Sequence, residues 1–280
     1  MDNPAVRLRQ RLARPEPLIM GVLNVTPDSF SDGGRYTDVD AAAARARQMV
    51  EEGADLIDVG GESTRPGAEA VPLDEERRRV LPLIEALTER VAVPLSIDTS
   101  KPQIMTEVGA AGVALINDVR ALQADGALSA AAALDASVCV MHMQGEPRSM
   151  QTAPQYDDVV REVGDFLEER VAACIDAGIG RERIAVDPGF GFGKTLAHNL
   201  SLLRHLGALV GRLDLPLLAG ISRKRMIGML TGGVPAEERL YGSIAAAVLA
   251  AERGARVLRV HDVRPTVEAL AIVQATIEAG

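Results

Sequence analysis

Short apolar segments alternate with longer amphipathic segments along the chain. Within each short segment the apolar residues are continuous and do not alternate with polar ones, as expected for parallel strands that are buried on both faces. We predict eight strands, over residues 18–24, 56–60, 94–98, 114–118, 137–142, 183–187, 216–222 and 256–261.

The longer segments are rich in Ala, Glu and Arg and predict helices. They cover residues 38–52, 73–90, 101–110, 123–134, 155–177, 195–211, 235–253 and 264–278. Because the strand–helix units follow one another with no break in composition, we predict a single α/β domain, a (β/α)₈ TIM barrel and not an open doubly wound sheet. Residues 17–280 would form this domain and residues 1–16 an N-terminal extension.

Each predicted strand ends in a polar residue or is directly followed by one. These residues are Asn24, Asp58, Asp98, Asn117 with Asp118, His142, Asp187, Ser222 and His261. A single Asp after a strand is usually the N-cap of the next helix. Polar ends on all the strands are better explained by a shared site, because a barrel brings the carboxyl ends of its strands to one rim. We therefore predict an enzyme active site at that rim.

The composition is that of an ordinary globular domain. Of the 280 residues 47% are hydrophobic and 25% are charged, which excludes a disordered chain. The longest apolar runs, such as residues 244–251, are much shorter than the ~20 residues that a membrane helix needs. A net charge of −9 argues against a nucleic-acid partner, since binding to a polyanion requires clustered positive charge. We expect neither a membrane nor a nucleic acid as partner.

Cysteine and lysine are both rare. No secretory signal follows the basic N-terminus, so we expect a cytoplasmic protein. Cys139 and Cys174 lack the spacing of metal ligands and are predicted to be buried, reduced thiols. The only lysines are Lys101, Lys194 and Lys224, while Arg supplies the remaining positive charge. A lysine retained in such a chain is a candidate for a role that needs a compact ammonium group.

Long loops follow the first two strands. Residues 24–34 read NVTPDSFSDGG and include Phe30 among hydroxyl and carboxylate groups. Because a barrel connection needs only about two to six residues, we predict a mobile active-site loop. Residues 60–67 read GGESTRPG and offer Thr64 and the guanidinium group of Arg65 to a phosphate. An ion pair of Arg65 with Glu62 or Glu69 is the alternative.

Residues 187–195, after the sixth strand, read DPGFGFGKT. This loop resembles a phosphate-binding Walker loop, but Pro188 occupies the position of the first glycine. It also lacks the dinucleotide-binding pattern, because Lys194 occupies the position of the third glycine. The glycines are better explained if they let the backbone lie close beneath a flat ligand.

The last two strands offer candidate anion sites. Lys224 follows Ser222 at the start of a helix, and a helix N-terminus with a cation suits a carboxylate or a phosphate. Lys224 could instead form a Schiff base, as in barrel aldolases. Arg259 and His261 are two residues apart on one strand, so their side chains point to the same side.

Asp98, Asn117 and Asp187 bring carboxylate and amide groups to the mouth of the barrel. Buried carboxylates need hydrogen-bond donors, and an aminopyrimidinone edge offers an amino group and a ring N–H to one carboxylate. Together with the candidate anion sites, these residues predict a flat, donor-rich heterocycle that carries a phosphate group. His142, on the fifth strand, is interpreted as structural.

The loops resemble those of the dihydropteroate synthase family, from about residue 17 to the end of the chain. The similar stretches are GVLNVTPDSFSDGG (21–34), IDVGGESTRPG (57–67), IDTSKP (97–102), INDV (116–119), VCVMHMQG (138–145), DPGFGFGK (187–194), GISRK (220–224) and RVHDV (259–263). The resemblance implies a transferase of folate biosynthesis and a sulfonamide target. Such enzymes condense 6-hydroxymethyl-7,8-dihydropterin pyrophosphate with p-aminobenzoate and release pyrophosphate.

The resemblance also implies a role for particular residues. The pterin would be held by Asp98, Asn117, Met141, Asp187, Gly191 and Lys224. The pyrophosphate would be held by Asn24, Thr64, Arg65, Arg259 and His261, with Asn24 as a ligand of Mg²⁺. The p-aminobenzoate would be bordered by Phe30, Thr64, Pro66, Phe190, Ser222 and Lys224. The residues expected to act in catalysis are Asp98, Lys224, Arg65, Arg259 and His261.

Two other classes share part of this pattern. A pterin-binding methyltransferase domain has the barrel and the Asp/Asn groups but does not need the loops 24–34 and 60–67. A non-catalytic relative should have lost loop residues that are present here. The family further implies a homodimer, to which the apolar helix 241–251 could contribute. Some family members have Ser directly after the strand-7 lysine, whereas Arg225 in this chain offers no hydroxyl group to p-aminobenzoate.

Overall fold

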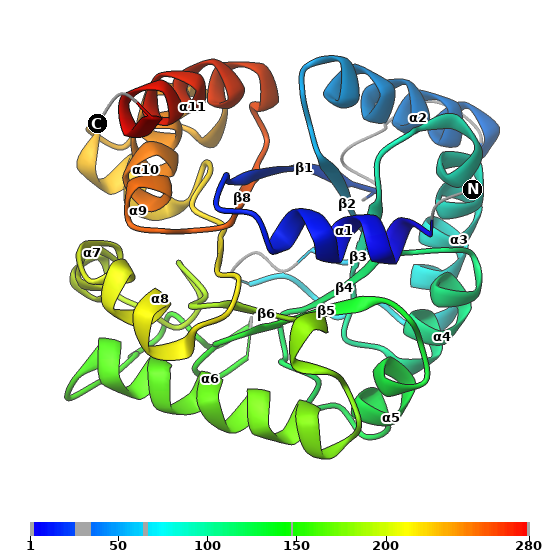
Figure 1. The fold of residues 1–280 in the computed structure, drawn as a ribbon, viewed down its shortest axis with the longest axis horizontal. Coiled ribbons are helices and arrows are strands. Elements are labelled where there is room, and N and C mark those ends of the chain that lie inside the picture. Colours follow the sequence, from blue (N-terminus) through cyan, green and yellow to red (C-terminus); the bar gives the residue numbers. More distant parts are fainter. Residues whose placement is uncertain (1–2, 26–34, 64–66, 147, 279–280) are drawn as a thin grey trace.

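Eight parallel strands form a barrel, as predicted (Figure 1). The computed structural model describes residues 3–25, 35–63, 67–146 and 148–278. The strands are β1 Leu18–Asn24, β2 Leu56–Gly60, β3 Leu95–Asp98, β4 Leu115–Asp118, β5 Ser137–Met141, β6 Ile184–Asp187, β7 Leu218–Ala219 and β8 Val257–Val260. They pair in the order β6-β5-β4-β3-β2-β1-β8-β7, and a parallel bridge between Val186 and Leu217 closes the barrel.

Helices surround the barrel on its outer side (Figure 1). They are α2 Arg35–Glu51, α3 Leu73–Arg90, α4 Pro102–Ala110, α5 Ala127–Ala132, α6 Val159–Asp176, α7 Leu196–Arg204, α8 Leu206–Leu213, α9 Arg225–Leu230, α10 Leu240–Glu252 and α11 Val263–Glu278. Short 3₁₀ helices precede β6 and α10, at Arg181–Arg183 and Ala236–Glu238. None of the described helices combines the length and the apolar composition that crossing a membrane requires.

Among the predicted helices, two differ from the structure by an interruption or a change of helix type. The helix predicted over 195–211 is divided into α7 and α8 at His205, whose φ of −102° and ψ of 17° are not helical. The helix predicted over 235–253 begins as a 3₁₀ turn, and α10 starts only at Leu240. The two cysteines are buried free thiols, as predicted.

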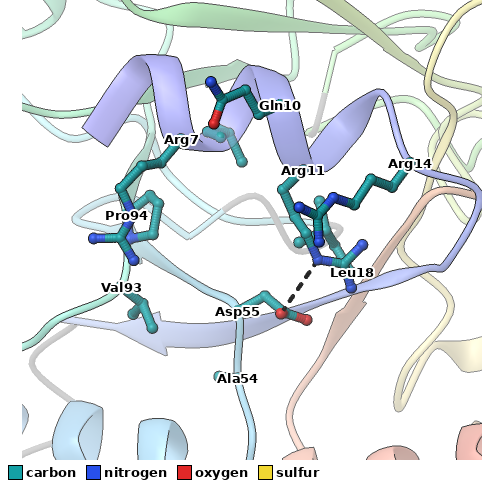
Figure 2. Close-up of a pocket in the computed structure, with 10 residues that line it drawn as sticks. Arg7, Gln10, Arg11, Arg14, Leu18, Ala54, Asp55, Val93 and Pro94 are labelled. Carbon is teal, nitrogen blue, oxygen red and sulfur yellow. Dashed lines mark ion pairs between the residues drawn. The ribbon is translucent and has the colours of Figure 1, made fainter. Parts of the chain in front are cut away.

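A helix that the sequence pattern did not predict lies across the amino end of the barrel. It is α1 (Pro4–Leu12), and it belongs to the predicted N-terminal extension. Its Leu8 and Leu12 are buried in one apolar cluster with side chains from several strands, among them Met20 and Leu56. Figure 2 shows α1 running above β1, where Arg11 pairs with an aspartate before β2.

The barrel interior changes from apolar to polar along its axis. At the amino end, the interior side chains of the strands pack with α1 and are apolar. Toward the carboxyl end, Asp58, Ser96 and Asn117 are buried. Asn117 on β4 and Ser96 on β3 both donate hydrogen bonds to Asp58 on β2. Because β4 and β2 do not pair with each other, these polar groups point into the barrel interior. The fold therefore separates an apolar end from a polar end.

Candidate active site

Arg259 on β8 connects two carboxylates at the polar end of the barrel. Its Nε donates a hydrogen bond to Asp58 Oδ2 at 2.6 Å, and its Nη2 donates one to Asp98 Oδ2 at 3.0 Å. The strand β1 lies between β8 and β2, so these contacts cross the barrel interior. Asp98, a predicted site residue, thus faces the same interior space as Arg259.

The predicted site did not include Asp58 as a binding residue. Asp58 is fully buried, and it accepts hydrogen bonds from Ser96 Oγ at 2.6 Å and from Asn117 Nδ2 at 3.3 Å. It was counted among the strand ends, but β2 continues to Gly60, so Asp58 lies inside the strand. An aspartate within an otherwise apolar strand was the available signal, because such a charge needs a buried partner.

Burial controls the protonation of Asp98. Burial raises the pKa of Asp98 to about 7. The positive charge of Arg259 lowers this pKa, and the negative charge of Asp58 raises it further. Burial by itself would lower the pKa of Arg259, but Asp58 and Asp98 hold that pKa above its ordinary value. Near neutral pH, one guanidinium cation therefore faces two carboxyl groups that compete for it. A ligand with N–H donors would favour the ionised form of Asp98.

The glycine-rich segment after β6 forms a turn beside Lys224. Asp187 Oδ1 accepts a hydrogen bond from the amide of Gly189 at 2.7 Å, and burial raises the pKa of Asp187 to about 6. Nζ of Lys224 lies 4.0 Å from the centre of the Phe192 ring, in cation–π contact. A Cβ atom at Gly191 would lie 3.2 Å from Lys224 Cδ, so this glycine lets the lysine stem approach the backbone.

The two phenylalanines of this turn have different surroundings. Phe190, predicted to border p-aminobenzoate, is 1% exposed and packs in the main hydrophobic core. Phe192, which the predicted site did not include, packs with Met141 and Met150 and contacts Lys224. Met141 also borders a hollow of about 190 Å³. Of the two rings, Phe192 is the one that lies at the candidate site.

Ser222 and His261 join the ends of β7 and β8. His261 Nδ1 lies 3.1 Å from Ser222 Oγ, and the backbone amide of His261 donates a hydrogen bond to the same oxygen at 3.2 Å. Burial and the charge of Arg259 lower the pKa of His261 to about 3, so the imidazole is neutral at neutral pH. The positive charge at the end of β8 therefore comes from Arg259.

Asn24 and Asp98 face a common space beside Gly60. A Cβ atom at Gly60 would lie 3.5 Å from Asn24 Oδ1 and 3.9 Å from Asp98 Oδ2. The glycine at the end of β2 thus leaves room between an amide oxygen and a carboxylate oxygen. This space adjoins the start of the loop that was predicted to bind phosphate.

Lys101 pairs with one glutamate of this loop and with one glutamate of α3. Its Nζ forms ion pairs with Glu62 and with the buried Glu76. Glu69, the other alternative partner of Arg65, pairs with Arg148 at 3.3 Å. Four predicted site residues lie outside the described residues, and their roles stay predictions: Phe30, Thr64, Arg65 and Pro66.

A larger hollow, of about 380 Å³, lies at the amino end, between α1 and the starts of β1 and β2 (Figure 2). Its lining includes Arg7, Arg11 and Asp55 and none of the polar strand ends. Because TIM-barrel enzymes react at the carboxyl ends of their strands, the candidate site is assigned to the polar rim and not to this hollow.

Comparisons with known proteins identify the family. The family model described as pterin binding enzyme matches residues 20–261. The dihydropteroate synthase of Escherichia coli strain K12 is 53% identical over 263 residues, which cover 94% of this chain and 93% of the relative. The chain belongs to the dihydropteroate synthase family. The resemblance read from the loops is thereby confirmed, together with the transferase class.

Solved structures of dihydropteroate synthases agree with this membership. The Yersinia pestis enzyme, in a sulfonamide drug complex, is 53% identical with a TM-score of 0.89, over 94% of this chain and 95% of the other. The Xanthomonas albilineans enzyme with 4-aminobenzoic acid is 56% identical with a TM-score of 0.88, over 95% and 94%. Fold and family are therefore shared along nearly the whole chain.

Proposed function

We propose that this chain condenses 6-hydroxymethyl-7,8-dihydropterin pyrophosphate with p-aminobenzoate, giving 7,8-dihydropteroate and pyrophosphate. The observation that carries the proposal is the buried group of Arg259, Asp58 and Asp98 at the carboxyl end of a dihydropteroate synthase barrel. A pterin has an amino group and ring N–H groups at one edge, and an ionised carboxylate accepts hydrogen bonds from both.

In the proposed reaction, the amino nitrogen of p-aminobenzoate forms a bond to the exocyclic carbon of the pterin, and the bond from that carbon to the pyrophosphate oxygen breaks. The nitrogen then loses a proton to solvent. An arylamine is uncharged at neutral pH, so no strong base is needed. Asp98, Asn117 and Asp187 would bind and orient the pterin, and Lys224 would lie beside the reacting carbon.

The p-aminobenzoate subsite is proposed beside Ser222 and Lys224. Phe192 supports this choice, because its ring lies against Lys224, whereas Phe190 lies in the core. The relative from X. albilineans binds 4-aminobenzoic acid and the relative from Y. pestis binds a sulfonamide drug. We expect a sulfonamide to compete with p-aminobenzoate in this chain as well.

The donor set near β1 suits Mg²⁺ in combination with the substrate. No group of three or more His, Cys, Asp or Glu residues able to hold a metal occurs in the described parts of the chain. Asn24 offers one amide oxygen, and Mg²⁺ commonly completes its shell with substrate phosphates and water. We propose that Asn24 would contribute to holding Mg²⁺, which when bound would stabilise the negative charge of the departing pyrophosphate.

We propose that two copies of the chain associate through α9, α10 and α11, which are adjacent in Figure 1. Exposed apolar side chains on these helices include Met229, Leu230, Tyr241, Leu249 and Ile272. Apolar surface of this kind is typical of lasting homodimer interfaces. Sedimentation velocity should give a dimer for the wild type and a monomer for the double variant Leu230→Lys/Tyr241→Lys.

The cytoplasmic location of the protein also stays a prediction.

Product analysis tests the proposed reaction. The purified chain is incubated with the pterin pyrophosphate, p-aminobenzoate and Mg²⁺, and 7,8-dihydropteroate and pyrophosphate are quantified by chromatography. We expect both products in equal amounts and none when p-aminobenzoate is omitted. Transfer of a methyl group from methyltetrahydrofolate in a parallel assay, without dihydropteroate formation, would instead support a methyltransferase.

A further inference from the structure

Lys194 is a buried amine that the proposed ligand contacts do not use. Its side chain lies at the end of the turn after β6 and is 3% exposed. Nζ lies 2.9 Å from His142 Nδ1, and it donates hydrogen bonds to the carbonyl oxygens of Gly189 at 2.9 Å and Phe192 at 3.0 Å. It also reaches the carbonyl oxygen of His142 at 3.3 Å. One amine thus connects the end of β5 to two points of the turn.

These contacts lead directly to Asp187. Gly189 has a φ of +69°, and a Cβ atom there would collide with the carbonyl oxygen of His142, so the turn and the end of β5 touch. Carbonyl groups that face one another need a donor between them, and Lys194 supplies it. On its other side, the amide of Gly189 donates to Asp187 Oδ1. Lys194 therefore holds the residue that orients the Asp187 carboxylate.

His142 is suited to accept a hydrogen bond from this amine. Burial and the nearby Lys194 lower the pKa of His142 to about 3, so its ring is neutral and Nδ1 can accept. The ring is fixed edge-on against Phe166, with 4.9 Å between the ring centres. Burial lowers the pKa of Lys194 to about 7, and the amine keeps at least two N–H donors in either protonation state.

We propose that Lys194 is a positioning residue for the pterin: with His142, it holds residues 188–193 in the shape that directs Asp187 and Phe192 toward the ligand. The inference rests on the proposed role of Asp187 in pterin binding. Without the amine, the carbonyl groups of the turn lose their donor, and burying them unpaired is unfavourable. The turn then relaxes, and the Asp187 carboxylate is no longer held in place for the pterin.

Arg183 provides a matched control at the opposite end of β6. Its guanidinium group donates hydrogen bonds to the carbonyl oxygens of Ala131, Leu134 and Ala136 at 2.6 to 3.1 Å. Like Lys194, it is a basic side chain whose N–H groups satisfy several backbone carbonyl groups beside the same strand. It lies at the amino end, away from the candidate site. Its removal therefore shows how much a loss of stability alone changes ligand binding.

The test compares Lys194→Met with Arg183→Met by urea unfolding, by the dissociation constant of 7,8-dihydropteroate and by steady-state kinetics. Both variants should be less stable than the wild type. Lys194→Met should raise the dissociation constant and the KM for the pterin substrate by about tenfold or more, with kcat at saturation changed less than about threefold. Arg183→Met should leave both constants within about twofold.

Unchanged product binding by folded Lys194→Met, or an equal loss of binding in both variants, would overturn the proposal. Because product binding is measured without turnover, a wild type that binds dihydropteroate but forms none would count against the proposed function alone. If Lys194→Met does not fold, His142→Leu serves instead. The amides of Gly189 and Phe192 should then exchange hydrogen about tenfold faster, and unchanged exchange would equally overturn the proposal.

Discussion

The two ends of the barrel are built from opposite kinds of interaction. At the amino end, Leu8 and Leu12 of α1 pack against apolar strand residues, and this burial stabilises the fold at any pH. At the carboxyl end, Arg259 and Asp98 are ionisable groups removed from water: burial raises the pKa of Asp98, and Asp58 and Asp98 raise the pKa of Arg259. The comparison indicates that one end stabilises the fold, while the other loses stability in order to bind a ligand.

The largest expected effect concerns the polar end. Asp98→Asn keeps the size of the side chain but cannot accept hydrogen bonds at both of its atoms, so we expect kcat/KM for the pterin substrate to fall about 100- to 1,000-fold. Steady-state rates at varied pterin concentration measure this loss. A wild-type kcat/KM in this variant would show that Asp98 does not bind the pterin.

The converse change is made at the amino end. Leu8→Ala removes a buried side chain from the cluster beneath the barrel, and we expect the free energy of unfolding to fall by about 2–4 kcal/mol. The KM for either substrate should stay within about twofold, because the rim is untouched. Urea unfolding and kinetics on the same preparation check both parts. A large rise in KM would show that the two ends are not independent.

Product binding should depend on pH if ionised carboxylates accept hydrogen bonds from the pterin. Since the pKa of Asp98 is raised to about 7 and that of Asp187 to about 6, affinity should fall as the pH decreases below 7. We expect a loss of about tenfold between pH 8 and pH 6 by isothermal titration calorimetry. Asp98→Asn should weaken the upper part of this dependence. Constant affinity over this range is the contrary result.

The same pKa predicts a gain in stability from Asp98→Asn. A folded-state pKa of about 7, above the ordinary 3.8, means that Asp98 favours folding below pH 3.8 and loses this contribution as the pH rises to 7. The variant should therefore match the wild type near pH 4 and have a melting temperature higher by roughly 5–10 °C at pH 8. Thermal scans at both pH values measure the difference. A lower melting temperature at pH 8 would mean that Asp98 stabilises the apoprotein.

The smallest effect is expected at Arg225, which is exposed at the start of α9. Arg225→Ser should change the KM for p-aminobenzoate by less than about threefold, because the backbone around Lys224 is kept. Varying p-aminobenzoate at saturating pterin measures this. A larger change would place the side chain of Arg225 at the subsite.

The barrel could be predicted from the sequence because its strands are continuous apolar segments with polar ends. The helix α1 could not, since four arginines and a glutamine among residues 7–14 hide the spacing of its few buried residues. The few buried residues of α1 form an apolar cluster only together with the interior side chains of the strands. Local patterns therefore gave the units of the fold but not the packing that closes its amino end.

The candidate site, like the fold, could be predicted in part from the sequence. Asp98 and Asp187 followed from their strand ends, whereas the pairing of Arg259 with Asp58 joins residues 201 positions apart and depends on the strand order. The choice between Phe190 and Phe192 depends on the left-handed glycines of the turn, which decide which ring points into the core. Long-range pairing and turn direction are set by the assembled barrel.

The central claim is that the reaction depends on the polar rim and not on the amino end. The most direct test measures pyrophosphate release, with Mg²⁺, for the wild type, Lys224→Ala and Leu8→Ala at a temperature where all three are folded. We predict release that requires p-aminobenzoate in the wild type and Leu8→Ala and that falls at least about 100-fold in Lys224→Ala. Equal release by the wild type and Lys224→Ala, or release independent of p-aminobenzoate, would contradict the claim.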